Sequence, residues 1–375
     1  LMVFASQFHE VLDLAPGYGW ALGEGRFDWD AFRGRLHREL DRLEGAYGRM
    51  LEAAGVTVHR ARAVLEDPHT VRLEDGTRLT AAHVLVATGG RPVRPQVPGA
   101  ALGMVSDDVF LMERLPGSLL IVGGGYIACE MAGIFRGLGV EVTQFYRGAQ
   151  ILRGFDDEAR GLIAEALRAR GVDLHLGTDL IQLGHRGDDF DLLVGEAARE
   201  PAPGEGAVKV KATNGMERVF DAVLFATGRA PNTEGLGLDA LGLRLGRRGH
   251  VAVDAYSQTA VPSVYALGDV TDRPQLTPVA IRDAMAFVQT VFRGNPTPAD
   301  HALVPSAVFT QPELGTVGLT EEEAREREPI EVYATSFRPM RTAFADRPDR
   351  ALMKLVVSRA TRKVLGVHIV APEAG

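Results

Sequence analysis

The stretch that decides the fold is SLLIVGGGYIACE, Ser118–Glu130. A short apolar run leads into three glycines, and apolar residues then recur at helical spacing. Gly123, Gly125 and Ala128 match the pattern G-x-G-x-x-A, in which glycine permits a tight turn and lets the backbone approach a pyrophosphate. The N-terminus of the helix that follows supplies oriented N–H donors. This stretch therefore predicts a strand, a turn and a helix that together bind a dinucleotide.

The next expected strand, Val140–Tyr146, indicates which dinucleotide is bound. An NAD site usually places an acidic residue near its end, where it binds the ribose 2′-hydroxyl. Tyr146 occupies that position, followed by Arg147, and Arg153 lies six residues further on. Two guanidinium groups without a carboxylate suit a 2′-phosphate, although both arginines could also be ordinary solvated surface residues. The pattern favours NADP over NAD.

Other segments continue the α/β pattern on both sides of this unit. Helices are expected at 31–55, 126–138, 157–170 and 278–293, and strands at 56–58, 83–87, 119–122, 140–146, 221–226 and 263–267. Residues 184–206, rich in Gly, Asp, Glu, Ala and Pro, are expected to form a mobile loop within the same domain. The C-terminal part contains short strands and a helix that opens at Thr320 with Glu323 in a capping box, so it predicts an α+β domain.

A second nucleotide site is indicated by three strand ends. Two expected strands run into the same tripeptide, Ala87-Thr88-Gly89 and Ala226-Thr227-Gly228, as in an internal repeat with one copy per nucleotide-binding half. A third ends in Gly268-Asp269, where a carboxylate and backbone N–H groups can meet a polyol and a pyrophosphate. Together the three strand ends predict a second bound nucleotide.

Composition excludes several classes of protein. The net charge of −8 argues against a nucleic-acid partner, and no apolar run reaches the roughly 20 residues of a membrane helix. Cys129 is the only cysteine, which argues against a secreted disulfide scaffold and favours the reducing cytoplasm. No metal site is expected.

The motifs together resemble the pyridine nucleotide-disulfide oxidoreductases, and within that family the chain is similar to the glutathione reductases of plants and bacteria. The likeness extends over essentially the whole chain. Besides the glycine motif, the matching stretches are Gly17–Trp20, Gly125–Glu130, Leu152–Asp156, Leu276–Ala280, Val317–Thr320 and Phe337–Met340.

The resemblance implies two Rossmann-like domains, one for FAD and one for NADPH, and an α+β dimerisation domain. The implied segments are 1–116 for the FAD domain, 117–250 for the NADPH domain, 251–301 for the continuation of the FAD domain and 302–375 for the dimerisation domain. The implied protein is a homodimer, a flavoprotein whose substrate is glutathione disulfide, with no nucleic-acid or membrane partner.

The resemblance also implies roles for individual residues. Those expected to line FAD are Ala63, Thr88, Gly89, Gly268, Asp269 and Thr277. Those expected to bind NADPH are Gly123, Gly125, Tyr126, Ile127, Glu130, Arg147, Arg153, Gly228 and Arg229. Tyr126 would act as an aromatic gate over the flavin, and Glu130 would orient the nicotinamide. Tyr47 matches a tyrosine near bound glutathione. On pattern alone, Tyr47 and Tyr126 are also ordinary apolar-face residues, and Glu130 a solvated helix carboxylate.

Three features of the family are absent from these residues. The FAD-binding G-x-G-x-x-G and the redox-active Cys-x4-Cys would lie before Leu1, and the His-Pro…Glu acid–base segment would lie after Gly375. We therefore expect both ends to be truncated and residues 1–375 alone to be inactive. Cys129 is expected to be a small buried side chain. Met285 stands where some relatives carry an arginine that contacts glutathione, which weakens the substrate assignment.

Alternatives remain open at this point. Within the family they are dihydrolipoamide dehydrogenase, mercuric reductase and a trypanothione-type reductase. The two arginines argue against the first, which uses NAD. A protein of another class, a non-catalytic nucleotide-binding protein, is supported only by the missing cysteine pair.

Overall fold

The computed structural model describes residues 1–23, 25–190 and 206–375, and these form two compact units. The first unit comprises Leu1–Leu36, Pro92–Gly228 and Pro305–Gly375, and the second comprises His37–Arg91 and Arg229–Val304. Within the described ranges, every helix is too short or too polar to span a bilayer.

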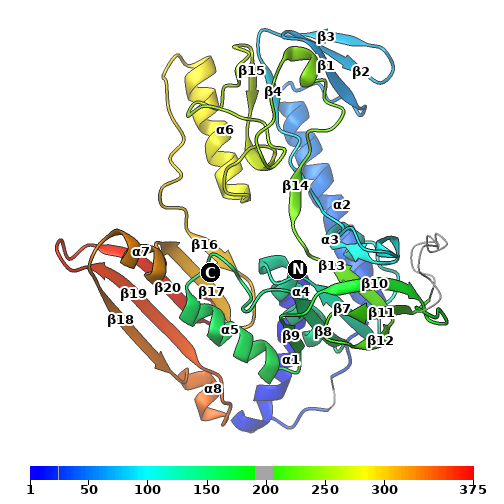
Figure 1. The fold of residues 1–375 in the computed structure, drawn as a ribbon, viewed down its shortest axis with the longest axis vertical. Helices are drawn as coiled ribbons and strands as arrows, with labels where there is room; N and C mark the ends of the chain where they lie inside the picture. The colour runs from blue at the N-terminus through cyan, green and yellow to red at the C-terminus, as the bar shows by residue number, and fades with distance from the viewer. Residues whose placement is uncertain (24, 191–205) are drawn as a thin grey trace. The chain divides into compact units, whose positions relative to one another are not determined.

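A five-stranded parallel sheet forms the centre of the first unit (Figure 1). Its order is β6 (Met104–Val105), β13 (Ala222–Phe225), β7 (Ser118–Val122), β8 (Glu141–Tyr146) and β9 (Asp173–Leu176). Neighbouring parallel strands need crossover connections, which are usually helical. Here α4 connects β7 to β8, and α5 connects β8 to β9, while a short α3 follows β6; their bounds are α4 (Tyr126–Gly137), α5 (Asp157–Ala169) and α3 (Ser106–Val109).

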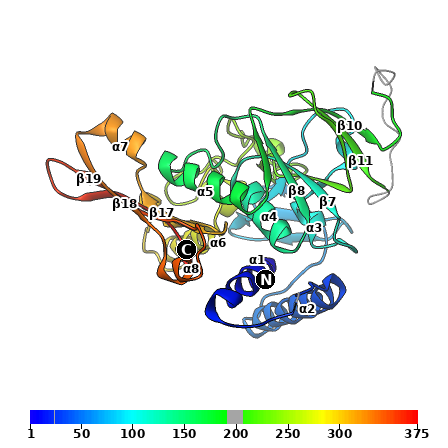
Figure 2. The same cartoon turned by 90° about the horizontal axis from the view of Figure 1, so that it is seen from below.

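The strand β7 is buried on both faces: Leu119 and Ile121 lie in a core cluster with residues of α4 and α5, and Leu120 lies in a second cluster with residues between 180 and 220. Leu119, Leu120 and Ile121 have no exposed surface, which explains why β7 is a continuous apolar run and not an alternating one. α4 packs on β7 and β8 (Figure 2). Asp156 caps α5 by accepting a hydrogen bond from the Glu158 backbone N–H at 3.2 Å.

A small antiparallel sheet is inserted in the chain between β9 and β13 of the parallel sheet. It consists of β10 (Leu180–His185), β11 (Val208–Ala212) and β12 (Glu217–Phe220). Of the loop expected at 184–206, residues 191–205 lie outside the described residues. Its first two residues, Gly184 and His185, belong to β10.

The C-terminal part of the first unit is a five-stranded antiparallel sheet with two short helices. The strand order is β16 (Ser306–Val308), β17 (Glu313–Gly318), β20 (Val364–Ala371), β19 (Ala351–Ser358) and β18 (Ile330–Phe337). The helices are α7 (Glu321–Arg327) and α8 (Met340–Phe344). The capping box at the start of α7 is confirmed, since Thr320 Oγ1 accepts from the Glu323 N–H and Glu323 Oε2 accepts from the Thr320 N–H. The expected α+β domain is confirmed as well.

One helix of the first unit was not expected from the sequence. α1 (Met2–Leu14) packs against α4 and ends in a 3-10 turn, η1 (Ala15–Tyr18). The buried Ser6 hydroxyl on α1 accepts a hydrogen bond from Gln311 Nε2 at 2.7 Å. This contact ties α1 to the turn that precedes β17.

The second unit contains a meander and a separate parallel pair. The antiparallel meander is β1 (Ala63–Asp67), β2 (Thr70–Leu73) and β3 (Arg78–Thr80), and the parallel pair is β4 (Val84–Val86) with β15 (Val264–Ala266). Its helices are α6 (Thr277–Phe292) and most of α2 (Trp29–Ala53). The pair β5 (Gly90–Pro92) and β14 (Arg229–Pro231) stands where the chain passes between the units.

The strand expected at 56–58 is absent from the described chain. These residues pair with no strand, the Val56 N–H donates to the Leu51 carbonyl at 3.0 Å, and Val56 and Val58 are 48% and 57% exposed. Two β-branched residues favour extended backbone, but a strand forms only where a neighbouring strand accepts its hydrogen bonds.

Candidate functional site

The turn between β7 and α4 is built for close approach of a ligand to the backbone. Gly123 has φ of +143°, and a Cβ at this position would lie 2.2 Å from the Ala226 carbonyl oxygen at the end of β13. A Cβ at Gly125 would meet nothing within 4 Å, and no side chain of the described residues caps α4 at Gly125. The backbone at Gly125 is therefore open to close approach of a ligand at the N-terminus of a helix, where anions bind.

Three hydrogen bonds join this turn to β8 and to the loop that follows β8. Gln144 Nε2 on β8 donates to the Gly123 carbonyl at 3.0 Å, the Leu152 N–H donates to the Gly124 carbonyl at 2.6 Å, and the Gly123 N–H donates to the Phe145 carbonyl at 2.9 Å. Because the carbonyls of Gly123 and Gly124 are bound on the protein side, the turn is preorganised for a pyrophosphate on its open side.

Gln144 is a site residue that the sequence analysis missed. Its side chain is fully buried, and its Oε1 has no hydrogen-bond partner among the described residues. The sequence feature that could have indicated Gln144 is a glutamine within a mostly apolar strand. A buried side-chain amide usually forms a hydrogen bond with another buried polar group.

Tyr146 closes the turn on its second side. A Cβ at Gly124 would lie 2.3 Å from the Tyr146 ring, so the ring rests directly on this glycine. The position where an NAD site would carry an acid is thus filled by a packed aromatic ring.

Cys129 is buried in α4 beneath the turn. It has no exposed surface, and burial raises the pKa of its thiol to about 12. A thiol with such a pKa stays protonated near neutral pH, and only the thiolate is a good nucleophile. Cys129 is therefore a packing residue in this structure.

Arg147 and Arg153 lie in the loop between β8 and α5. Both are exposed, and neither forms a hydrogen bond or ion pair with any residue that the structure describes. Two unneutralised guanidinium groups on one ten-residue connection leave this edge of the sheet positively charged. A dianionic phosphate is the ligand group that such a pair binds best.

Tyr126 and Glu130 stand on the first turns of α4. Tyr126 is 38% exposed, and Ile127 between them is half-buried. Glu130 Oε1 accepts a hydrogen bond from the Phe309 backbone N–H at 2.8 Å. Burial raises the pKa of Glu130, and this hydrogen bond opposes the rise in part, so the net pKa is above its ordinary value. Their roles as gate and orienting carboxylate stay predictions.

In the second unit, Thr88 and Gly89 follow β4 and are bound to Asn232. Thr88 Oγ1 donates to the Asn232 carbonyl at 2.7 Å, and Asn232 Nδ2 donates to the Thr88 carbonyl at 3.0 Å. Gly89 has φ of +70°, and a Cβ there would meet nothing within 4 Å. This crossing therefore also presents open backbone at a strand end.

Asp269 follows β15 in a single 3-10 turn that begins at Gly268. Its carboxylate makes no hydrogen bond or ion pair with a described residue, while Gly268, with φ of +70°, accepts a hydrogen bond from Thr271 Oγ1 at 2.7 Å. A half-buried, unpaired carboxylate on a rigid turn fits a ligand hydroxyl. Ala63 begins β1, and the exposed Thr277 begins α6.

The remaining predicted residues are placed as follows. Arg229 Nη2 donates to the Gly90 carbonyl at 2.6 Å within the second unit. Gly228 has φ of +142° and lies three residues after β13, as the last residue of the segment Pro92–Gly228 of the first unit. Tyr47 on α2 is 63% exposed, and Met285 on α6 is 67% exposed. The residues predicted to bind NADPH, from Gly123 to Gly228, thus lie in the first unit. Arg229 and the residues predicted to line FAD lie in the second unit.

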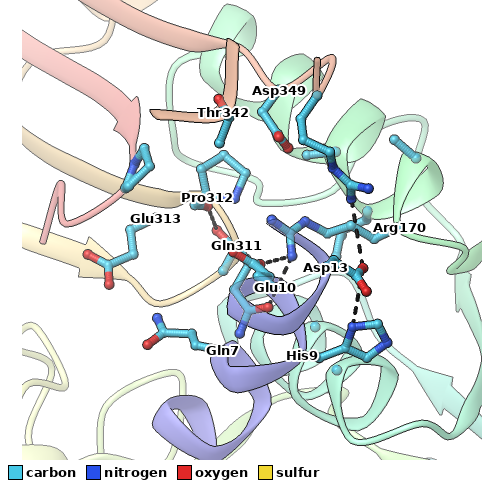
Figure 3. A pocket seen from close by; sticks show the side chains of 18 of the residues that line it. Gln7, His9, Glu10, Asp13, Arg170, Gln311, Pro312, Glu313, Thr342 and Asp349 are labelled. Carbon is cyan, nitrogen blue, oxygen red and sulfur yellow. Dashed lines mark hydrogen bonds and ion pairs between the residues drawn. The ribbon is translucent and has the colours of Figure 1, made fainter. Parts of the chain in front are cut away.

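A cavity of about 550 Å³ lies elsewhere in the first unit (Figure 3). α1, α4, α5, the Thr310–Glu313 turn and residues 339–350 line it, and Arg170 on its wall pairs with Glu10 and hydrogen-bonds to Gln311. None of the predicted cofactor residues is among those that line it. Arginines and carboxylates alternate on its wall, so its chemistry does not favour one ligand.

Comparison with known proteins decides the family. Residues 6–284 match the family described as pyridine nucleotide-disulphide oxidoreductase, and residues 304–375 match the dimerisation domain of the same family. The chain belongs to the pyridine nucleotide-disulphide oxidoreductases. The expected fold class is confirmed by these matches, and the last match shows that the C-terminal sheet is a dimerisation domain.

Individual members of this family are similar over the whole chain. A glutathione reductase from Burkholderia cepacia is 43% identical over 375 residues, covering 100% of this chain and 79% of the relative. A trypanothione reductase from Leishmania donovani is 35% identical, covering 100% of this chain and 76% of the relative. The solved structure of the HOCl-induced flavoprotein disulfide reductase RclA from Escherichia coli superposes with a TM-score of 0.83 at 25% identity, covering 100% of this chain and 79% of that one.

The cofactors of this pyridine nucleotide-disulphide oxidoreductase are FAD and NADPH, and the residues present fit both. The glycine turn before α4, with a free pair of arginines nearby, suits a phosphorylated dinucleotide. The open Gly89 turn and the unpaired Asp269 carboxylate suit the pyrophosphate and polyol of a flavin dinucleotide.

Proposed function

We propose that this protein is an NADPH-dependent reductase of glutathione disulfide. The observation that supports NADPH is the pair Arg147 and Arg153, exposed and without a partner among the described residues, beside the glycine turn. The observation that favours glutathione disulfide over other disulfides is the higher identity to a glutathione reductase than to a trypanothione reductase. We also propose that it acts in the cytoplasm, because residues 1–375 hold a single cysteine, the free and buried Cys129, and so no structural disulfide among themselves.

The overall reaction cleaves one sulfur–sulfur bond. NADPH gives up a hydride and becomes NADP⁺, one proton comes from solvent, and glutathione disulfide takes up both to become two molecules of glutathione. When bound, FAD would supply the two-electron transfer from the nicotinamide to the disulfide of a cysteine pair, which is thereby reduced to thiols. Residues 1–375 contain one cysteine, so they do not themselves supply that pair.

The chain's own residues bind and orient in this proposal. The N–H groups at the start of α4 hold the pyrophosphate of NADPH, and Arg147 and Arg153 hold the 2′-phosphate. Asp269 and the Thr88-Gly89 turn hold the flavin dinucleotide. Tyr126 covers the nicotinamide position, and Tyr47 contacts the disulfide substrate. Glu130 orients the nicotinamide.

The experiment is a panel of steady-state rates with flavin-loaded protein that also carries the cysteine pair, because residues 1–375 contain a single cysteine. Oxidation of NADPH and of NADH is followed with glutathione disulfide, trypanothione disulfide, lipoamide and Hg²⁺ as acceptors. The proposal expects the highest kcat/KM with NADPH and glutathione disulfide. A higher value with another acceptor assigns the protein to that branch of the family, and no oxidation with any acceptor means a nucleotide-binding protein without reductase activity.

A further inference from the structure

The loop that presents Arg153 is held rigidly although its arginines are free. Ile151 and Leu152 are fully buried, and Leu152 has φ of +54°, a conformation that a branched L-residue rarely adopts. It persists only because the surroundings hold it in place. Its N–H is bound to the Gly124 carbonyl, so the loop is joined to the pyrophosphate turn.

Arg160 on α5 holds the same loop from below. Its Nε donates to the Ile151 carbonyl at 2.7 Å and its Nη2 to the Gln150 carbonyl at 3.1 Å, while its Nη1 pairs with Asp157. The segment before Arg153 is therefore fixed by bonds to its backbone.

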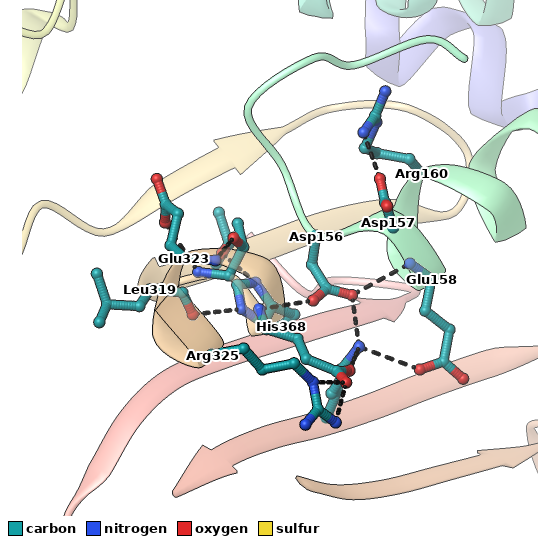
Figure 4. Close-up of polar contacts among 12 residues, drawn as sticks. Asp156, Asp157, Glu158, Arg160, Leu319, Glu323, Arg325 and His368 are labelled. Carbon is teal, nitrogen blue, oxygen red and sulfur yellow. Dashed lines mark hydrogen bonds and ion pairs between the residues drawn. The ribbon is translucent and has the colours of Figure 1, made fainter. Parts of the chain in front are cut away.

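The segment after Arg153 is fixed by a buried charge cluster around Asp156 (Figure 4). The Asp156 side chain is 1% exposed, and its Oδ1 lies 2.9 Å from Nζ of Lys354 on β19, whose side chain is 3% exposed. Lys354 Nζ also lies 2.7 Å from Glu321 Oε2 and 3.3 Å from Glu158 Oε2. The Lys354 ammonium thus joins the dimerisation domain, to which Glu321 also belongs, to the nucleotide-binding half through two carboxylates, those of Asp156 and Glu158.

Asp156 also caps two helices from the same position. Its Oδ1 accepts from the Glu158 N–H at the start of α5, and its Oδ2 accepts from the Glu321 N–H at the start of α7, at 3.2 Å in each case. Burial raises the pKa of Asp156, but the bonds from Lys354 and from the Glu321 N–H outweigh it, so its pKa is below its ordinary value and it is charged. The carboxylate is consequently held in one place from every side.

We propose that Lys354, a residue of the dimerisation domain, is a positioning residue for the choice of NADPH. It fixes Asp156, which lies three residues after Arg153, and thereby fixes the backbone from which the Arg153 guanidinium reaches the 2′-phosphate. This inference rests on the proposed role of Arg147 and Arg153. It predicts that a change in the C-terminal sheet alters nucleotide selectivity without touching the nucleotide.

The test measures binding of NADP⁺ and NAD⁺ to the flavin-loaded protein by isothermal titration calorimetry. Lys354→Met is expected to weaken NADP⁺ about tenfold, the lower end for one hydrogen bond to a charged group. NAD⁺ lacks the 2′-phosphate, so its affinity should change by less than about twofold. Lys354→Arg should restore most of the selectivity because it keeps the charge. Lys363→Met, at an exposed position in the turn between β19 and β20, is the matched control and should change neither affinity.

Asp156→Asn keeps a capping oxygen and leaves Glu321 and Glu158 to pair with Lys354. It therefore tests the same inference if Lys354→Met does not fold, and it should lower the NADP⁺ to NAD⁺ affinity ratio in the same direction. Equal loss of both nucleotides, or no change in either, in a folded Lys354 or Asp156 variant overturns the inference. A wild-type protein that binds NAD⁺ as tightly as NADP⁺ contradicts the proposed function instead.

Discussion

Replacing Arg147 and Arg153 by glutamine should change the free energy of NADP⁺ binding while leaving the free energy of unfolding almost unchanged. Neither guanidinium forms a hydrogen bond or ion pair with a described residue, so the free energy of unfolding should change by less than about 0.5 kcal/mol for each substitution. Any effect on nucleotide affinity then reports the 2′-phosphate contact alone.

The expected size of the effect follows from exposure. A hydrogen bond to a charged group is worth about 1.5–3 kcal/mol, which corresponds to about 10- to 150-fold in affinity. Both arginines are solvent-exposed, which weakens charge pairs, so we expect about tenfold per residue for NADP⁺. The double variant should lose less than about 100-fold, because two groups on one phosphate are not independent.

The assay is calorimetric titration of each variant with NADP⁺ and NAD⁺, with thermal unfolding recorded in parallel. Arg114→Gln is the control, since Arg114 is exposed and unpaired among the described residues but lies outside the site. Equal weakening of both nucleotides would show that the arginines do not bind the 2′-phosphate.

Three further outcomes are expected. Gln144→Leu removes the bond to the Gly123 carbonyl and should weaken NADP⁺ and NAD⁺ equally, by about 2- to 10-fold, in calorimetric titration; a selective loss of NADP⁺ would contradict this. Tyr126→Ser should leave appreciable turnover while changing nicotinamide affinity and flavin fluorescence, and loss of flavin reduction by NADPH in stopped-flow measurements would mean that Tyr126 takes part in the chemistry. Cys129, with its pKa raised to about 12, should resist iodoacetamide at pH 8 until the protein is unfolded, as followed by mass spectrometry; rapid alkylation of the native protein would show that the thiol is accessible.

The features that could be predicted from the sequence are local ones. The apolar strand before Gly123 and the helix after Gly125 follow from a pattern confined to a dozen residues, and the structure places both elements as expected. The capping box at Thr320 is equally local. The α/β class follows from the repetition of such patterns along the chain.

The features that were missed depend on contacts between distant residues. Lys354 and Asp156 are 198 positions apart, and neither is unusual in its own segment. α1 has no side-chain cap at its start, so the capping signals that mark a helix were lacking. The strand expected at 56–58 was predicted from local propensity alone. It does not form, because no neighbouring strand pairs with these residues.

The most direct test of the proposed function is the stoichiometry of the reaction with glutathione disulfide. Flavin-loaded protein that also carries the cysteine pair is mixed with limiting NADPH and excess glutathione disulfide, and NADPH absorbance and free thiol are measured in the same sample. The proposed reaction predicts two thiols formed for each NADPH consumed, and no thiol formed when NADPH is omitted. NADPH consumed without thiol formation, or no consumption at all, would contradict glutathione disulfide reduction by this protein.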